Sequence, residues 1–301
     1  MKPLRDSDPT MGLEGARRFL DELQLDERGF LRVSTLLKRL AGIHLPLSPK
    51  NLSLVAARLS ARMRDRGVMG YEEYVDLVAG GAADLRAEFV QALTTNTTHF
   101  FREAPHFAAL RTVLAELTAA KSNSGAYEWR LWCAATSTGQ EPYSIAMTLA
   151  ECIPDLARWG VRFLASDIDL AALGAASKGL YSAAEMKDVP PHLRQRFFAP
   201  FVAPRGERLF RVKDELRELI TFAPLNLVAW PYPFQHRFDI VFCRNVLIYF
   251  DRETAAKVVQ NLVGALSVGG CLFLGHSESG VARPPGVEPI ATAVWRKVRE
   301  K

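Results

Sequence analysis

The sequence predicts an α/β protein in which a small all-helical domain precedes a larger domain built on a parallel sheet. Three observations lead to this fold class. The chain has 301 residues, a length that suggests about two domains. Apolar residues recur at steps of three and four from about residue 28 to 94, which is the helical period. After about residue 125, short apolar runs alternate with amphipathic segments, as in a parallel sheet with crossover helices.

Residues 1–25 are polar and mixed, with Pro3 and Pro9 and no sustained periodicity, so we expect a flexible N-terminal arm. Residues 26–94 are then expected to form the helical domain. Breakers divide this stretch at Pro46/Pro49 and at Gly67/Gly70. The positions with helical spacing are Val33, Leu37, Leu40, Val55, Leu59, Met63, Tyr71, Tyr74, Leu77, Phe89 and Leu93.

Residues 95–301 are expected to form the second domain. Apolar runs predict four of its strands, at 129–135, 161–165, 239–243 and 271–274. Amphipathic segments predict the helices between them, at 142–153, 170–177 and 253–266. The carboxyl ends of parallel strands meet at one edge of the sheet, where open α/β sheets bind their ligands.

A long stretch, 179–237, separates the second of these helices from the third strand. It contains a predicted helix at 191–198 and two strand-like runs, Arg208–Val212 and Leu219–Phe222. We therefore expect a small antiparallel β-subdomain inserted at about 199–224. Such a hairpin leaves an open strand edge, which can accept an extended peptide as an added strand.

Composition narrows the classes of function. Hydrophobic residues make up 49% and charged residues 24%, as in ordinary globular proteins. The net charge of +5 permits an acidic partner without establishing nucleic-acid binding. The spacing of the four cysteines, Cys133, Cys152, Cys243 and Cys271, predicts neither a metal site nor a disulfide framework. We find no signal-peptide core and no run long enough to span a membrane, so we expect a cytoplasmic protein without membrane insertion.

Two loops at the expected edge carry candidate binding residues. After the first strand, small residues at 134–139 let a ligand approach the backbone. The loop has no GxGxxG motif, so an ordinary tight turn explains these residues equally well. The second strand ends at Ser166-Asp167-Ile168-Asp169. An acid at this place accepts hydrogen bonds from ribose hydroxyls in nucleoside-binding folds, a role that we assign to Asp167. We expect Asp169 to cap the helix that follows.

Two further segments combine polar and aromatic side chains. The third strand runs into Cys243–Phe250 and places Asn245 and Tyr249 over the same edge, although a buried Asn more often satisfies neighbouring backbone. The segment TTNTTHFFRE, residues 94–103, joins the domains either as a solvated linker or as a lid over the crevice. Its two Phe residues favour the lid, because a solvated loop gains nothing from exposing them.

Six stretches occur in order along the chain: TTNTTHFFRE (94–103), STGQEPYSIAM (137–147), ASDID (165–169), FAPLNL (222–227), CRNVLIYF (243–250) and GHSES (275–279). Together they resemble the CheR-type methyltransferases, which methylate glutamates of bacterial chemoreceptors using S-adenosylmethionine. The resemblance covers about residues 28–298 and implies a Rossmann-like class I methyltransferase domain, with S-adenosylhomocysteine as the product.

The resemblance also implies which residues form the site. Glu141 would hold the methionine ammonium, Asp167 the ribose, and Arg102 with Tyr249 would flank the transferred methyl. One departure is Gln140, where the family often has a second acid. The implied cofactor-binding residues are Asn96, Thr98, Arg102, Glu141, Asp167, Asn226, Leu227, Asn245 and Val246.

The stretch from Lys50 to Arg66 carries five basic residues and one acid. Arg58, Arg62 and Arg66 are spaced four apart on one helical face, beside an apolar stripe. Such a face is usually solvated. Three stacked arginines without acids repel one another, however, so we expect them to bind an acidic substrate helix.

Three functions compete. A glutamate methyltransferase acting on the cytoplasmic domains of chemoreceptors leads, and we expect it to be a monomer. A methyltransferase acting on another protein or on nucleic acid is the alternative, but the arginine face lacks the aromatics that stack bases. A non-catalytic scaffold would be expected to have lost Arg102, Glu141 or Asp167. A carboxylate acceptor needs no general base, so we expect His99 and His276 not to take protons.

Overall fold

The computed structural model describes residues 25–153 and 155–300. The chain divides into two compact units, before and after the bond between Leu93 and Thr94. The expected arm at residues 1–25 lies outside the described residues, apart from Leu25.

The first unit is helical. Asp26 caps its first helix by accepting a hydrogen bond from the backbone of Gly29 at 2.7 Å, and Gly42 ends that helix in the left-handed region. The predicted apolar stripes form its core, except that Leu40 is half-buried and Leu77 is exposed. The helices are α2 (Glu27–Ala41), α3 (Pro49–Asp65), α4 (Tyr71–Gly80) and α5 (Ala83–Leu93).

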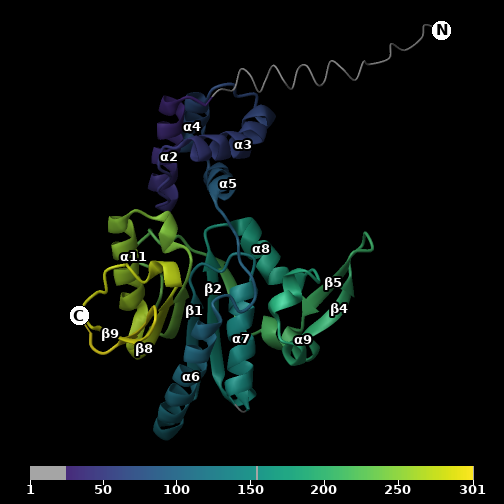
Figure 1. The fold of residues 1–301 in the computed structure, drawn as a ribbon, viewed down its shortest axis with the longest axis vertical. Coiled ribbons are helices and arrows are strands. Elements are labelled where there is room, and N and C mark those ends of the chain that lie inside the picture. The colour runs from purple at the N-terminus through teal and green to yellow at the C-terminus, as the bar shows by residue number, and fades with distance from the viewer. Residues whose placement is uncertain (1–24, 154, 301) are drawn as a thin grey trace, which may run out of the picture. The chain divides into compact units, whose positions relative to one another are not determined.

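The second unit is built on a seven-stranded sheet in the order β6-β2-β1-β7-β8-β10-β9 (Figure 1). The first five strands of this order are parallel, and β10 is antiparallel to both of its neighbours. The strands are β1 (Glu128–Cys133), β2 (Gly160–Asp167), β6 (Ile220–Pro224), β7 (Phe238–Cys243), β8 (Leu266–Leu274), β9 (Val287–Ala291) and β10 (Val294–Lys297).

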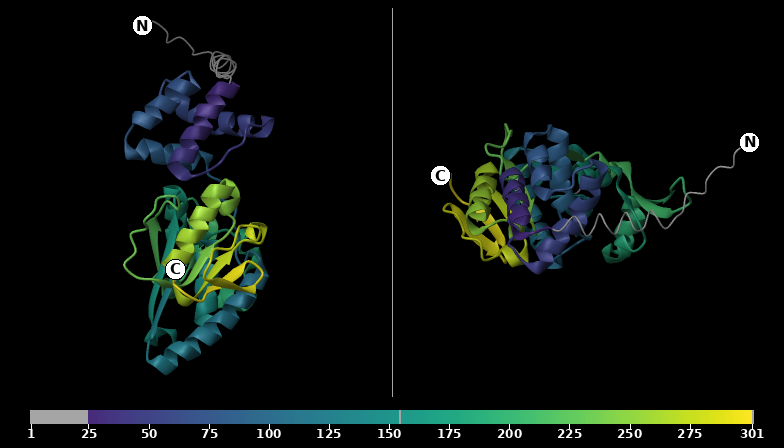
Figure 2. Two further views of the ribbon diagram at one scale, coloured as in Figure 1. Left: turned by 90° about the vertical axis from the view of Figure 1, so that its left-hand side faces the viewer. Right: turned by 90° about the horizontal axis from the view of Figure 1, so that it is seen from above.

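Helices cover both faces of this sheet, because its central strands are apolar on both sides. On β1, Leu131 and Cys133 pack on the face covered by α6 and α7, whereas Trp132 packs on the opposite face with α11. Figure 2 shows α11 lying along its face of the sheet. The helices are α6 (Ala104–Ser124), α7 (Gln140–Cys152), α8 (Leu170–Lys178), α9 (Pro191–Phe197), α10 (Asp214–Arg217) and α11 (Arg252–Ala265), with short 3-10 helices η1 (Leu156–Arg158), η2 (Glu185–Asp188), η3 (Leu247–Tyr249) and η4 (His276–Glu278).

A separate three-stranded antiparallel sheet follows α8 in the chain, in the order β3-β5-β4. Its strands are β3 (Leu180–Tyr181), β4 (Phe198–Val202) and β5 (Arg208–Val212). The expected insert at 199–224 is therefore wrong at its carboxyl end. Residues 220–224 form β6, which pairs in parallel with β2 in the large sheet, and α10 lies between β5 and β6 in the chain, so these two strands do not form a hairpin.

Two further features differ from the sequence prediction. Helix α6 was not predicted, although Pro105 lies in its first turn and Gly125 ends it in the left-handed region. The sheet is also mixed rather than purely parallel, because β9 and β10 form an antiparallel hairpin at its edge. The four predicted strands are present as β1, β2, β7 and β8.

Candidate active site at the carboxyl edge of the sheet

The candidate site lies where four neighbouring strands end. In sheet order these are β2, β1, β7 and β8, which end at Asp167, Cys133, Cys243 and Leu274. Because these strands are parallel, the loops that follow them all emerge at one edge. The prediction that separate motifs gather at one edge of the sheet is confirmed.

The loop after β1 is fixed by backbone contacts. Thr136 donates its N–H to the carbonyl of Ser166 at 3.0 Å, and Ser137 donates its N–H to Asp167 Oδ2 at 2.7 Å. Gly139 has a φ of 98°, and a Cβ there would lie 2.6 Å from the hydroxyl of Tyr181. The positive φ and the close approach of Tyr181 account for this glycine, as the tight-turn interpretation of the loop expects.

Of the two roles predicted for Asp167 and Asp169, the structure tests the one assigned to Asp169. Asp169 Oδ1 accepts the backbone N–H groups of Ala171 and Ala172 at 2.9 and 3.0 Å, so its capping role is confirmed. Asp167 Oδ1 accepts the N–H of Asp169 at 2.9 Å. Burial raises the pKa of Asp167, although backbone hydrogen bonds oppose that shift. Each of its oxygens retains further acceptor capacity at the edge.

The segment 94–103, named the lid segment below, is attached to this edge. Asn96 donates from Nδ2 to Asp169 Oδ2 at 2.6 Å, and Thr94 donates its hydroxyl to the same oxygen at 3.0 Å. In return, the Ser137 hydroxyl donates to the carbonyl of Asn96 at 3.1 Å. The segment is therefore not a solvated linker over these residues, and Phe100 within it is fully buried.

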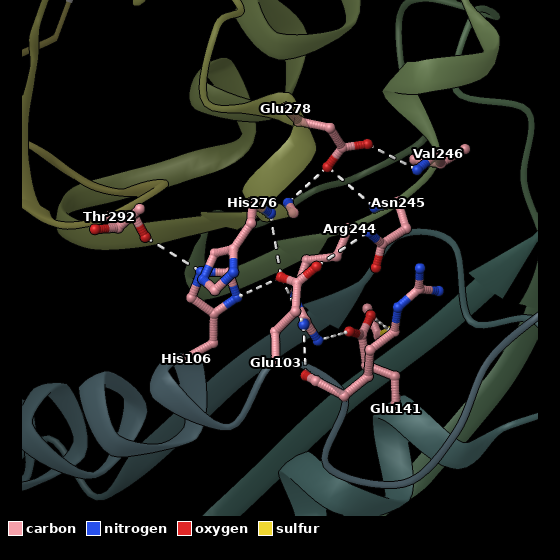
Figure 3. A network of polar contacts seen from close by, with 12 residues as sticks. Glu103, His106, Glu141, Arg244, Asn245, Val246, His276, Glu278 and Thr292 are labelled. Atoms are coloured by element: carbon pink, nitrogen blue, oxygen red, sulfur yellow. Dashed lines mark hydrogen bonds and ion pairs between the residues drawn. The ribbon is translucent and has the colours of Figure 1, made fainter.

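A buried guanidinium lies at the centre of the site (Figure 3). The side chain of Arg244, directly after β7, is 1% exposed and pairs with Glu141 at the start of α7. It also donates to the carbonyl of Arg102 at 2.5 Å and pairs with Glu103 at 3.0 Å, both in the lid segment. Cys133 donates its thiol to the second oxygen of Glu141 at 3.3 Å. Burial lowers the pKa of Arg244, but Glu141 and Glu103 outweigh it and the net shift is upward.

A second buried carboxylate, Glu278, organises the backbone beside this cluster (Figure 3). Its oxygens accept four backbone N–H groups at 2.6–3.0 Å, from Gly275, Asn245, Val246 and Leu247. Asn245 is held in the left-handed region with a φ of 58°, and its Nδ2 donates to Glu103 at 3.2 Å. The two loops after β7 and β8 are thereby joined.

Glu103, His106 and His276 are close enough to ligate a metal ion. Burial raises the pKa of Glu103, but Arg244, Asn245 and the backbone of His276 lower it more, to about 2. Burial and the charge of Arg244 lower the pKa of His106 to about 4, and its Nε2 lies 3.2 Å from the carbonyl of Thr292. Because the Glu103 carboxylate is already bound by the Arg244 guanidinium, we interpret the group as a hydrogen-bonded network rather than as a metal centre.

Other predicted residues are placed less directly. Leu225 donates its N–H to the carbonyl of Asp167 at 3.0 Å, which brings Asn226 and Leu227 to the same edge. Arg102 is half-buried and donates to the carbonyl of Thr97 at 2.9 Å. Within the described residues, the side chains of Thr98 and Tyr249 make no hydrogen bond that ties them to the site.

The predicted basic face lies on α3 in the helical unit. Arg62 donates to the carbonyl of Arg58 at 2.8 Å, one turn earlier. Arg66, at the end of the helix, forms an ion pair with Glu88 of α5. The premise of three arginines without acids is therefore wrong for Arg66, because a carboxylate distant in the sequence folds next to it.

Sequence reasoning missed Arg244, Glu103 and Glu278. Each lies inside a motif that carries the resemblance, in CRNVLIYF, TTNTTHFFRE and GHSES respectively. For Arg244 that location was a usable signal, because an ionisable residue directly after an apolar strand needs a partner when it is buried. Glu103 and Glu278 do not directly follow a strand and carry no such signal.

Two family profiles match the chain. The CheR methyltransferase all-alpha domain covers residues 28–94, and the CheR methyltransferase SAM binding domain covers residues 96–291. The chain belongs to the CheR methyltransferase family. The resemblance, the fold class and the assignment as an S-adenosylmethionine-binding methyltransferase are thereby confirmed.

Individual relatives agree with this membership. A probable chemotaxis protein methyltransferase of Rhizobium etli is 44% identical over 241 residues, covering 79% of this chain and 88% of the relative. The chemotaxis protein methyltransferase of Escherichia coli is 41% identical over 262 residues, covering 86% and 87%. Among the residues that the structure describes, no helix combines the length and apolar character needed to cross a membrane.

Proposed function

We propose that the protein transfers the methyl group of S-adenosylmethionine to glutamate side chains on the cytoplasmic helices of bacterial chemoreceptors. The observation that carries this proposal is the gathering of the six motif stretches at one sheet edge in a chain of the CheR family. The products are glutamyl methyl esters and S-adenosylhomocysteine, made in the cytoplasm by a monomer in the service of chemotaxis adaptation.

The charges at this edge fit the methionine end of the cofactor. Glu141 and Glu103 share the single guanidinium of Arg244, which leaves one net negative charge to match an ammonium group. In the proposed site Glu141 binds that ammonium and Asp167 binds the ribose hydroxyls. Asn96, Thr98, Arg102, Asn226, Leu227, Asn245 and Val246 complete it.

S-adenosylmethionine supplies an electrophilic methyl group on a sulfonium, and the chain's own residues align the acceptor. A glutamate carboxylate is ionised at neutral pH, so no residue has to remove a proton before it attacks. His106 is neutral there, because its pKa lies at about 4. We therefore assign catalysis to alignment, with Arg102 and Tyr249 steering the acceptor carboxylate and with no role as a base for His99 or His276.

The decisive experiment identifies the modified group. The protein is incubated with methyl-labelled S-adenosylmethionine and receptor cytoplasmic fragments, and the modified residue is mapped by mass spectrometry. We expect labelled glutamyl esters that release methanol in alkali. A base-stable product, as from an amine or a nucleobase, would contradict the proposal and favour the alternative methyltransferase on another protein or on nucleic acid.

Two surfaces are proposed to recognise the receptor. The first is the basic face of α3, where Arg66 already pairs with Glu88 and where Arg58 and Arg62 are proposed to bind the acidic helix that is methylated. The second is the small sheet, whose outer strand β4 has no further strand beside it within the described residues. Val202 on this strand is 66% exposed. A cavity of about 580 Å³ lies at the other end of β4, lined by Phe198 and Pro200 of that strand and by Met186 and Phe210 among others. An extended receptor segment can pair with β4 as an added strand.

The small-sheet surface is tested by shortening the turn between β4 and β5 at Ala203–Glu207. We expect weaker binding of a receptor fragment that carries its flexible segment, and unchanged binding of S-adenosylhomocysteine. Equal affinity of the shortened and full-length proteins for that fragment would refute this docking site.

A further inference from the structure

Arg244 is a buried cation to which the family resemblance assigns no role. Its side chain is 1% exposed, and three groups from two distant parts of the chain surround it. One is an oxygen of Glu141, which lies 103 positions away in the sequence. The others are the Arg102 carbonyl and the Glu103 carboxylate, directly before α6. The ring of Phe107 lies 6.0 Å from its guanidinium carbon.

We propose that Arg244 is a positioning residue that holds Glu141 and the lid segment in register around the methionine end of the cofactor. The inference rests on the proposed function, because it uses the roles assigned there to Glu141 and Arg102. Through Glu141, Arg244 sets where the ammonium is bound. By donating to the Arg102 carbonyl, Arg244 fixes the position of the Arg102 backbone. The Arg102 side chain then extends from this fixed backbone to the reacting groups.

A guanidinium suits this task and an ammonium does not. Its planar fork presents five donors in fixed directions, so Nη1 can reach Glu141 while Nη2 reaches both Arg102 and Glu103. A lysine has one nitrogen on a flexible stem and cannot span these acceptors together. If either ion pair of Arg244 were lost, the carboxylate of Glu141 or of Glu103 would remain buried and charged without its partner.

The placement of Arg244 predicts a selective defect. Only the methionine end of the cofactor depends on Glu141 and Arg102, whereas the adenosine end is assigned to Asp167 and the loop at 226–227. Arg244→Lys should therefore weaken S-adenosylhomocysteine at least tenfold and change the affinity for 5′-methylthioadenosine, which lacks the amino-acid end, by less than twofold. A general loss of structure would weaken both ligands alike.

The experiment measures both ligands by calorimetric titration with the wild type, Arg244→Lys and Arg217→Lys. Arg217 is a matched control, because it also pairs with a carboxylate and a carbonyl, those of Asp214 and Ser177. Equal losses for both ligands, or no loss for either, would overturn the inference. Failure of the wild type to bind S-adenosylhomocysteine, or a base-stable methylated product, would instead contradict the proposed function.

A second variant keeps the test decisive if Arg244→Lys does not fold, as judged by circular dichroism. Glu103→Gln weakens the arm of the network that holds the lid segment, weakens the bonds that Glu103 accepts from Asn245 and from the backbone of His276, and removes one negative charge. We expect kcat to fall at least tenfold and the affinity for S-adenosylhomocysteine to fall by a smaller factor, because Arg244 still holds Glu141. An unchanged kcat in this variant would overturn the positioning role.

Discussion

Asp167 ends β2 at the candidate site, where it is proposed to bind the ribose hydroxyls of the cofactor. Asp167→Asn should weaken S-adenosylhomocysteine by about 1–3 kcal/mol, because an amide offers one acceptor oxygen where the carboxylate offers two. Calorimetric titration measures the loss. Asp188→Asn removes the same charge from an exposed acid in η2 and should leave the affinity unchanged. Equal affinities in all three proteins would remove Asp167 from the site.

Glu103 makes stability depend on pH in the acid range. Its folded-state pKa of about 2 lies below the ordinary value of 4.5, so the ionised form favours the folded state. The stabilisation is complete above pH 4.5 and is lost as the pH falls from 4.5 towards 2.

The wild type should therefore exceed Glu103→Gln in free energy of unfolding by on the order of 2–3 kcal/mol at pH 7. This difference should shrink at pH 3, and urea unfolding at both pH values measures it. A difference that stays constant with pH would show that the Glu103 charge contributes nothing.

For single residues, the sequence predicted which motifs form the site better than it predicted which side chains bond to one another. Asp169 was predicted as a cap because its partners are two and three residues away, in the helix it begins. The partner of Arg244 at Glu141 lies 103 positions away, and the partner of Glu278 at Asn245 lies 33 away. No local pattern encodes which distant carboxylate the fold will bring to a given guanidinium.

Helix α3 carries the basic face that is proposed to recognise the substrate. Reversing the half-buried Arg58 and Arg62 to Glu should raise KM for a receptor fragment steeply at low salt and less at high salt, because salt screens the attraction between their charges and an acidic substrate. The affinity for S-adenosylhomocysteine should not change.

The matched control for α3 reverses two basic residues of α11, Arg252 and Lys257, both exposed. It changes the net charge equally and should leave KM near the wild-type value. A KM that responds equally to both pairs, or that is independent of salt in every protein, would count against recognition by α3.

Helices and strands were predicted where one apolar period dominates the sequence. They were missed where pairing with distant strands decides the structure. The helices of the first unit and strands β1, β2, β7 and β8 follow clear apolar periods. The run that forms β6 matches a hairpin strand equally well in sequence, and only its pairing with β2 assigns it to the large sheet. The antiparallel β9 is mostly exposed and β10 has only four residues, so neither gave a strand signal.

At the scale of the whole molecule, every proposed cofactor contact falls in the second unit, between residues 96 and 246. Hydrogen exchange should therefore slow on addition of S-adenosylhomocysteine at residues 134–139, 166–169 and 244–247, and not in helices α2 to α5. Mass spectrometry of peptic fragments measures this. Protection of residues 27–93 comparable to that of the loops would place part of the site in the helical unit.

The bonds to Glu278 have a consequence for which substitutions the chain tolerates. All four donors are backbone N–H groups, so the side chains at 246 and 247 can vary without breaking them, and only proline removes a donor. Position 275 is different, since a Cβ there would lie 2.8 Å from Glu278 Oε2. Natural variation in this loop should therefore exclude proline at 246 and 247 and retain glycine at 275, whereas the apolar character of Leu247 is set by its burial in the core and not by these bonds.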